Sequence, residues 1–219
     1  MTEERPDRPT PRSVADTYDE IASEFAAKRE NPWPEVVAFI EGARAETALD
    51  VGCANGRHTE LLADVATRAI GLDASRGLLH EAMERKRDHG FDAALVQGDA
   101  ARLPFCTDTI DLLTYVATMH HLPTRAARIE SLDEIARVLT RDGRALVSVW
   151  STEHDTFDAT EGFDTTVTFT LPDGTDVPRY YHIYDPDEFG ADLAASALAV
   201  EREWVSQGNC YAVVGSEAR

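Results

Sequence analysis

The sequence of 219 residues predicts an α/β protein with a doubly wound, mostly parallel sheet of seven strands, which a C-terminal antiparallel hairpin completes. Two observations predict this fold. Between residues 47 and 150, short apolar runs alternate with segments whose apolar residues recur at helical spacing, which is typical of a parallel sheet with helices on both faces. Near the end, Val200–Val205 and Cys210–Val214 flank the turn sequence Gln207-Gly208-Asn209, which indicates a pair of antiparallel strands.

Two helices are expected before the first strand. Apolar residues at helical spacing run through Val14–Phe25, and Ser13 is a suitable N-cap in front of them. The prolines of Asn31-Pro32-Trp33-Pro34 end this helix, and a second helix is expected from Pro34 to Gly42.

The alternating elements follow in the central part of the chain. The expected strands are Thr47–Val51, Arg68–Leu72, Ala93–Val96, Ile110–Val116 and Arg144–Trp150, and the expected helices are Arg57–Val65, Gly77–His89 and Arg125–Leu139. In the last third, the expected elements are the extended segments Thr166–Leu171 and Tyr180–Tyr184 and the helix Asp187–Ala197. Pro172-Asp173-Gly174 is typical turn sequence, so it should connect the two extended segments.

The composition bounds the class of protein. A net charge of −19 comes from 40 acidic and 21 basic residues spread along the chain. This favours a surface adapted to concentrated salt, in the cytoplasm of a halophile, over an acidic tail or partner-binding patch. No run approaches the roughly 20 apolar residues of a membrane span. The three cysteines are far apart, which argues against a disulfide framework and an intrinsic metal site.

The domain organisation is expected to be simple. Met1–Arg12 is polar and contains prolines but no apolar run that could act as a signal peptide, so we expect a flexible tail. Residues 13–219 are expected to form a single domain, because neither an internal repeat nor a linker interrupts them.

A nucleotide-binding loop is the strongest local motif. In Ala48–Arg57, a strand carries Asp50 near its end, and a tight loop of small residues with Gly52 and Gly56 then opens a helix. Small residues let a loop backbone approach a ligand closely. A dinucleotide fingerprint would need glycines at positions 54 and 57, which hold Ala54 and Arg57, so the sequence argues against NAD.

Two further carboxylates follow at the ends of the next strands. Asp73 comes 23 positions after Asp50, the spacing of acids that accept hydrogen bonds from a ribose diol. Asp99 follows the third expected strand and is placed to accept from an adenine amino group. Each alone could be a helix cap, but three acid-ended strands in order predict a nucleoside cofactor at the edge where open α/β sheets bind ligands.

These motifs resemble the class I methyltransferases that use S-adenosylmethionine (SAM), whose Asp-x-Gly-x-Gly-x-Gly loop matches Asp50, Gly52 and Gly56. Ala54 departs from the pattern, because a glycine is usual there. The resemblance implies SAM as the cofactor, bound by Asp50, Gly52, Gly56, Asp73, Asp99 and by Tyr18, which helps to cover it.

The segment after the fourth strand, Thr118–Leu122, lies where this fold presents the methyl group to the acceptor. It lacks the Asn/Asp-Pro-Pro-aromatic box of amine-methylating relatives, so an oxygen or carbon acceptor is favoured. Together with Tyr18–Pro34 and Arg179–Tyr184, it resembles the tRNA wobble-uridine carboxymethyl methyltransferases. The resemblance spans about residues 14–215 with a poorly matched stretch at Glu153–Val177.

This second resemblance implies a tRNA substrate and a reaction. The acceptor is the carboxylate of 5-carboxymethyluridine, which becomes a methyl ester and, being already anionic, needs no strong base. The enzyme must hold an oxygen in line with the methyl group and exclude water, and arginine suits a carboxylate because its planar fork binds both oxygens. We expect Arg29, His120, Arg179 and His182 to orient the acceptor.

The same resemblance implies a partner, a small zinc-ribbon activator protein that adds a strand to the sheet edge and forms a heterodimer. Ala93–Val96 is the expected edge strand. Two alternatives stay open at this point. One is a class I methyltransferase acting on a small molecule such as a quinone precursor, and the other is a non-catalytic subunit with the SAM-binding fold.

Overall fold

The computed structural model describes residues 9–216, and it contains the predicted mostly parallel seven-stranded sheet. The strand order is β3-β2-β1-β4-β5-β9-β8. These strands are β3 (Ala94–Gln97), β2 (Ala66–Asp73), β1 (Ala45–Val51), β4 (Ile110–Val116), β5 (Leu139–Trp150), β9 (Asn209–Ser216) and β8 (Leu198–Ser206). All pairs from β3 to β5 are parallel, whereas β9 runs antiparallel to both neighbours, so the predicted C-terminal hairpin is confirmed.

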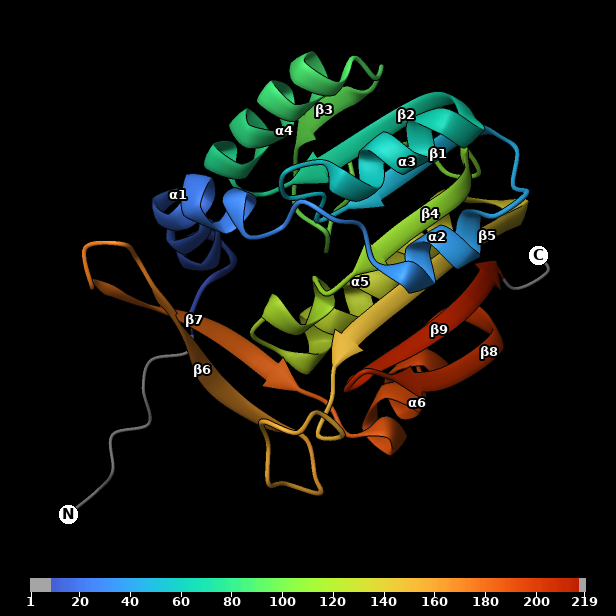
Figure 1. Ribbon diagram of the computed structural model, residues 1–219. Coiled ribbons are helices and arrows are strands. Elements are labelled where there is room, and N and C mark those ends of the chain that lie inside the picture. The colour runs from blue at the N-terminus through green and yellow to red at the C-terminus, as the bar shows by residue number, and fades with distance from the viewer. Residues whose placement is uncertain (1–8, 217–219) are drawn as a thin grey trace.

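Helices cover both faces of the sheet (Figure 1). On one face, α2 (Pro34–Ile40) and α3 (Arg57–Val65) bury Val36, Ile40 and Leu62 against the strands. On the other, α5 (Arg125–Val138) and α6 (Pro186–Ala194) bury Leu132 and Phe189 in the largest apolar cluster. Because both faces are covered, the central strands are apolar on both sides, as the continuous apolar runs predicted. None of the described helices is long and apolar enough to cross a membrane.

Helix α1 (Pro11–Ala27) packs against α4 (Arg76–His89) at the edge of the sheet (Figure 1). It starts at Pro11, with Thr10 as the N-cap, so the prediction of Ser13 as the N-cap was wrong. Ser13 is instead the N3 residue of a capping box, in which it and Thr10 bond reciprocally. Pro11 and Arg12 therefore belong to the helix and not to the predicted tail, whose residues 1–8 lie outside the described residues.

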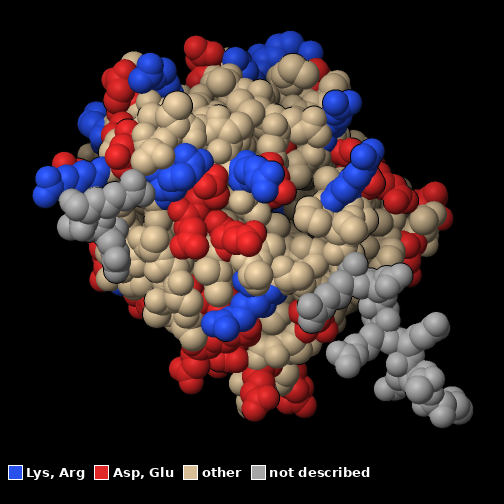
Figure 2. Space-filling model, turned by 180° about the vertical axis from the view of Figure 1, so that it is seen from behind, with Lys and Arg blue, Asp and Glu red and all other residues tan. Residues whose placement is uncertain are grey.

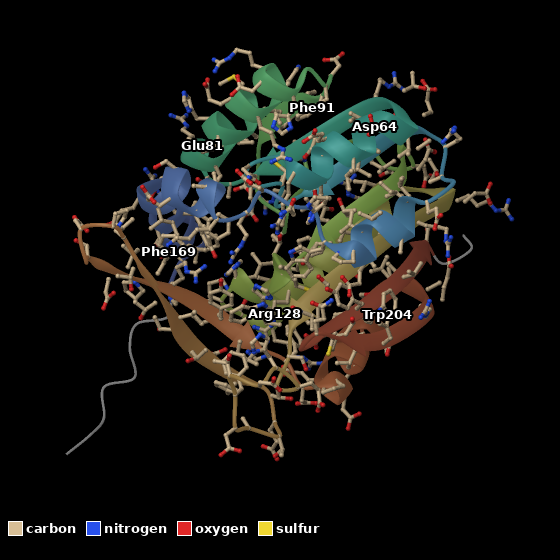
Figure 3. The ribbon with its side chains drawn as sticks, viewed as in Figure 1. Asp64, Glu81, Phe91, Arg128, Phe169 and Trp204 are labelled. Carbon is tan, nitrogen blue, oxygen red and sulfur yellow. The ribbon has the colours of Figure 1, made fainter. Side chains whose placement is uncertain are left out.

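A separate two-stranded sheet, formed by β6 (Phe163–Thr170) and β7 (Asp176–Ile183), is inserted between β5 and α6. Its antiparallel strands are longer than the predicted extended segments, and the turn lies where it was predicted. Phe169 is labelled on the hairpin in Figure 3. The hairpin reaches over to α1, where Phe169 belongs to one buried cluster with Tyr18, Ile21 and Ala22. As a result, α1 and the hairpin together flank the carboxyl ends of the parallel strands (Figure 1).

Candidate active site

A cavity of about 970 Å³ lies at the carboxyl ends of β1 to β4, beneath α1. Open α/β sheets bind their ligands at this edge. Among its lining residues are Tyr18, Gly52, Ala54, Asp73, Asp99, Thr118 and His121. Four of the six predicted cofactor residues, Tyr18, Gly52, Asp73 and Asp99, therefore come together around one space, whereas Asp50 and Gly56 are not among its lining residues.

Asp50 and Gly56 lie beneath the loop and hold its shape. The buried carboxylate of Asp50 accepts from the hydroxyls of Thr59 (2.7 Å) and Thr114 (2.8 Å), which ties β1 to α3 and β4. Gly56 has a φ of +76° at the start of α3, and a Cβ there would meet the Cβ of Ala82 at 3.3 Å. Both residues act on the cofactor loop from behind, so they position it without facing the cavity.

Asp73 presents its carboxylate to the cavity at the end of β2. Its Oδ2 accepts from the backbone N–H of Ala54 (2.8 Å) and its Oδ1 from that of Ser75 (2.9 Å). Each oxygen keeps a further lone pair, so the group fits a ribose diol as predicted. Burial raises the pKa of Asp73 to about 6, with these backbone hydrogen bonds acting in the opposite direction.

We predict that SAM binding weakens as the pH falls through 6. On the predicted role of Asp73, the ionised carboxylate would accept hydrogen bonds from the diol with both oxygens, whereas protonation turns one of these acceptors into a donor, so proton uptake would compete with binding. One pH unit below a pKa of about 6, affinity should drop about tenfold. Calorimetric titration from pH 8 to 5 measures this. Asp99→Asn, which changes an exposed carboxylate of the same cavity, should keep the pH dependence; a flat wild-type profile would contradict the assignment.

Ala54 occupies the loop position where a glycine is usual in this family. Its φ is +48°, in the left-handed region, and its methyl group is partly buried against Tyr18 and Leu78. The strained backbone costs about 1–2 kcal/mol in a residue with a Cβ, whereas a half-buried methyl group contributes less than about 0.8 kcal/mol. The strain is therefore larger than the gain from packing.

Accordingly, Ala54→Gly should raise the free energy of unfolding by about 0.5–1 kcal/mol. It should not weaken SAM binding, because the backbone N–H that Asp73 accepts is retained. Urea denaturation and calorimetric titration measure the two effects. A loss of stability in this variant would show that the methyl group contributes more than the strain costs.

A chain of hydrogen bonds joins β7 to the cavity through α1. Arg179 Nη1 donates to Tyr181 Oη (2.8 Å), which lies 3.4 Å from Tyr18 Oη. Tyr18 Oη lies 3.0 Å from His121 Nε2, and His121 Nδ1 lies 3.0 Å from the carbonyl of Tyr180. Because a carbonyl only accepts, Nδ1 carries the proton, and Nε2 accepts from Tyr18. Burial lowers the pKa of His121 to about 4, so the ring is neutral near pH 7.

His120 is buried behind His121 and does not line the cavity. Its ring stacks on Tyr181 with centroids 4.9 Å apart, and its Nδ1 accepts from the backbone N–H of Trp150 (3.0 Å). The proton of the neutral ring is therefore on Nε2. Burial lowers the pKa of His120 well below its usual value, so the ring is neutral, and it positions Tyr181 by stacking and Trp150 by accepting its backbone N–H.

Arg179 is a buried cation with no carboxylate partner among the described residues. Only 5% of its surface is exposed, and its Nε has no hydrogen-bond partner. The guanidinium packs over the rings of Phe169 and Tyr181, and it lines a second cavity of about 310 Å³ whose wall it shares with Tyr18. Because an unpaired buried charge costs several kcal/mol, this arrangement indicates that an anion binds here.

His182 lies on the opposite face of β7 from Arg179. Residues three apart in a strand point to opposite sides, so Tyr181, not His182, accompanies Arg179. His182 Nδ1 contacts Asp164 (2.7 Å) and Nε2 contacts Glu188 (2.9 Å). Both ring nitrogens are therefore engaged. His182 is near enough to His120 for its charge to lower the pKa of that ring, but it lines neither the main cavity nor the cavity of Arg179.

Arg29 also lies outside the main cavity. It follows the last turn of α1, where its guanidinium packs over Phe25 at 5.1 Å from the ring centroid. It lines a third, separate cavity with Trp33, Arg57 and Trp150. The predicted group of four acceptor residues is therefore divided among different places.

Three residues belong to the segments Thr118–Leu122 and Arg179–Tyr184 but were not among the predicted site residues: Thr118 and His121, which line the main cavity, and Tyr181, which supports it through hydrogen bonds. Thr118 fills the space above Gly52, and His121, not His120, reaches the cavity. Tyr181 was identifiable from the sequence, because the period of two in a strand pairs it with Arg179. The order of the two histidines depends on the 3-10 turn Met119–His121, which the sequence did not predict.

Comparison with known proteins identifies the relatives of this chain. A family model described as a methyltransferase domain matches residues 48–143. A putative methyltransferase of Encephalitozoon cuniculi is 35% identical over 181 residues, which cover 79% of this chain and 80% of that protein. The mouse tRNA (carboxymethyluridine(34)-5-O)-methyltransferase is 34% identical over 145 residues, 66% of this chain. These residues make up 21% of the mouse protein, so the chain spans about a fifth of that relative's length.

Among solved structures, the complex between the Haloferax volcanii Trm112 methyltransferase activator and a putative methyltransferase aligns with a TM-score of 0.70. The alignment covers 94% of this chain and 99% of the matched chain at 18% sequence identity. At this identity the likeness establishes the fold, and it agrees with the strand order described above.

Proposed function

The chain belongs to the class I SAM-dependent methyltransferases, and from this premise we propose that it methylates the side-chain carboxylate of 5-carboxymethyluridine at the wobble position of a tRNA. Relatives from mouse, yeast and Arabidopsis are named for methylation of carboxymethyluridine 34 and share 31–34% identity with this chain over about two thirds of its length. The two alternative readings, a small-molecule methyltransferase and a non-catalytic subunit, are less well supported by these relatives.

The observation that carries the proposal is the buried, unpaired guanidinium of Arg179 beside Tyr18. A neutral acceptor would leave this charge uncompensated, whereas a carboxylate would supply the missing counter-charge and an acceptor for its orphan Nε. Tyr18 lines both the SAM cavity and the cavity of Arg179, so an anion held by Arg179 lies next to the cofactor.

The residues around Arg179 suit transfer to a carboxylate. Bound SAM would supply an electrophilic methyl group on its sulfonium. Transfer to a carboxylate would form an O–C bond as the S–C bond of SAM breaks, and it would release S-adenosylhomocysteine. Because the acceptor is already anionic, the residues of this chain would only have to hold the oxygen in place and would transfer no proton. No general base is needed, in agreement with the low pKa values of His120 and His121, which leave both rings neutral. The role of Arg179 and Tyr181 is to orient the oxygen, and that of α1 and the β6–β7 hairpin is to exclude water.

A zinc-ribbon activator is the proposed partner, and β3 is its docking strand. As expected, β3 is an edge strand, with only β2 beside it. Met83 of the adjacent α4 is 54% exposed and provides an apolar contact next to this edge. Strand addition there would satisfy the free backbone groups of β3. A chain that is monodisperse and fully active when expressed alone would contradict this partner.

The proposed setting is the cytoplasm of a halophile. Acidic residues lie in several separate groups over the face shown in Figure 2, interspersed with arginines and lysines, as expected for a surface in concentrated salt. Because salt screens phosphate contacts, recognition of the tRNA should depend on local shape and on the buried arginine.

The experiment that tests the function is transfer of labelled methyl groups from SAM to tRNA of a strain that lacks this gene, in high salt, with and without the activator. We expect label in a base-labile ester at the wobble uridine. A tRNA whose wobble uridine lacks the carboxymethyl group is the matched control and should stay unlabelled. Intact SAM binding without labelling of any tRNA would instead favour a small-molecule acceptor.

A further inference from the structure

The third cavity, of about 380 Å³, lies between the α1–α2 connection, the start of α3 and the end of β5. In Figure 1 this connection runs across the front of the molecule from α1 to α2. The side chains that matter for its chemistry are Lys28, Arg29, Glu30, Trp33, Arg57 and Trp150. None of these residues takes part in the proposed binding of SAM, so the cavity needs a separate explanation.

The cations of this cavity have no acidic partners among the described residues. Arg29 donates only to the backbone carbonyl of Lys28 (3.4 Å), and Arg57 only to that of Asn31 (3.3 Å). In contrast, Arg85, Arg137 and Arg144 each pair with a glutamate at 3.1 Å or less. Within residues 9–216, Arg44 also lacks a carboxylate partner, but it is exposed to solvent, whereas Arg29 and Arg57 are partly buried and share one cavity. In a chain with 40 acidic and 21 basic residues, two partly buried arginines in one cavity without an ion pair are unexpected for a purely structural role.

Arg29 and Arg57 also repel each other. Burial, followed by the charge of Arg29, lowers the pKa of Arg57 to about 10, and the nearby carboxylate of Asp50 offsets only part of this effect. Glu30 lines the same cavity, but its side chain is exposed and forms no ion pair with either arginine. Two positive charges that face the same cavity raise the free energy of the protein unless an anion binds between them. The electrostatics of the cavity therefore favour an anionic ligand.

Trp150 connects this cavity to the proposed acceptor site, while Trp33 forms its wall beside Arg57. Arg57 lies over the ring of Trp33 at 5.8 Å from its centroid. The ring of Trp150 stacks on Tyr181 with centroids 5.0 Å apart, and Tyr181 accepts the hydrogen bond of Arg179. The stacked rings of Trp150 and Tyr181 therefore lie between the cavity of Arg29 and Arg57 and the guanidinium of Arg179. This arrangement matches two anionic groups that belong to one ligand.

We propose that this cavity binds a backbone phosphate of the RNA substrate, adjacent to the nucleotide that is methylated, with Arg29 and Arg57 as the ligands of the phosphate oxygens. Trp33 then forms an apolar wall for the neighbouring sugar or base. The inference rests on the proposed function, and it moves Arg29 from the acceptor carboxylate to the phosphate. Arginine suits this role because its planar fork binds two phosphate oxygens.

The test compares Arg29→Ala, Arg57→Ala and Arg57→Lys with Arg44→Ala. Arg44 is a matched control, because it is exposed, donates only to the carbonyl of Ala43, and lies directly before β1, at the amino end of that strand. The probe is an anticodon stem-loop RNA, titrated against the protein–activator complex over a range of salt concentrations, with a parallel titration of SAM.

We expect each alanine variant of Arg29 or Arg57 to bind the stem-loop about tenfold more weakly and to reduce the slope of log K against log salt by about 0.7, the loss of one phosphate contact. Arg57→Lys should retain the slope, and Arg44→Ala should match the wild type. SAM affinity should stay within about twofold throughout.

Equal salt slopes in all variants would overturn the inference. A loss of SAM affinity as large as the loss of RNA affinity would also overturn it, because it would assign the cavity to the carboxylate of the cofactor. Failure of the wild-type complex to bind the stem-loop would contradict the proposed function itself. The two failures are therefore distinguishable.

Discussion

Replacing Arg179 by methionine should lower the rate of methyl transfer by about 100-fold or more and leave the protein at least as stable as the wild type. The loss of activity is expected because, on the proposed function, the guanidinium orients the acceptor carboxylate beside the cofactor. Positioning groups of this kind typically contribute two to three orders of magnitude in rate. The affinity for SAM should change little, since Arg179 does not line the cofactor cavity.

The stability effect has the opposite sign from that of an ordinary core mutation. Arg179 is buried without a counter-charge, and methionine can keep its packing against Phe169 and Tyr181. Only the hydrogen bond to Tyr181 is lost, about 1 kcal/mol. Removal of an uncompensated buried charge gains more than this, so the free energy of unfolding should stay constant or rise by about 1–4 kcal/mol.

Arg128→Met is the matched control. Arg128, labelled in Figure 3, is equally buried, but it lies near the carboxylates of Glu188 (3.7 Å) and Asp192 (4.0 Å). Its removal leaves these charges less compensated and should destabilise the protein by about 2–3 kcal/mol. Urea denaturation and single-turnover methyl transfer measure the two variants. A large loss of stability in Arg179→Met would show that Arg179 is a structural residue.

The sequence predicted the sheet because its information is local. Each strand is a continuous apolar run, and each covering helix has its own apolar stripe, so the alternation alone indicates a parallel sheet covered on both faces. The cofactor edge was predictable for the same reason, since Gly52, Asp73 and Asp99 each lie at or just after the carboxyl end of a strand. The carboxyl ends of parallel strands meet at one edge whatever the details of packing.

The site residues that the sequence placed wrongly depend on the direction in which each side chain points. Asp50 and Asp73 each lie near the carboxyl end of an apolar strand, but Asp50 points to Thr59 and Thr114 beneath the loop, whereas Asp73 faces the cavity. No local sequence pattern distinguishes a side chain that faces the cavity from one that points away from it. The separation of Arg179 from His182 was available from the period of two in a strand. It was missed because the resemblance treated the segment as one motif. The place of Arg29 depends on where α1 ends, and element boundaries are weakly encoded.

Gly52→Ala should abolish measurable SAM binding, with a loss of affinity of about 100-fold or more, because two separate costs add at this position. The first is backbone strain, since the φ of Gly52 is +72°. The second is steric. A Cβ would lie 2.1 Å from Oγ1 and 2.7 Å from Cβ of Thr118, so either the loop or the turn after β4 has to move. Both segments line the cofactor cavity.

Gly42→Ala separates the two costs. Gly42 has the same φ of +72°, but a Cβ at this position would meet no other part of the protein within 4 Å, and the residue is outside the cavity. It should lose about 1–2 kcal/mol of stability and bind SAM like the wild type. The difference in stability between the two variants then measures the clash with Thr118, which is about 1–3 kcal/mol for overpacking. Calorimetric titration of SAM and urea denaturation give both quantities.

Thr118→Ala in the Gly52→Ala background tests whether the clash acts through Thr118. The second substitution removes Oγ1 and Cγ2 but keeps the Cβ, which lies 2.7 Å from the new methyl group. We therefore expect partial recovery of SAM affinity, to a level between the single Gly52→Ala variant and the wild type. A double-mutant cycle measures this coupling. Strictly additive effects would mean that the cofactor loop responds to backbone strain alone, and that Thr118 does not fix its position.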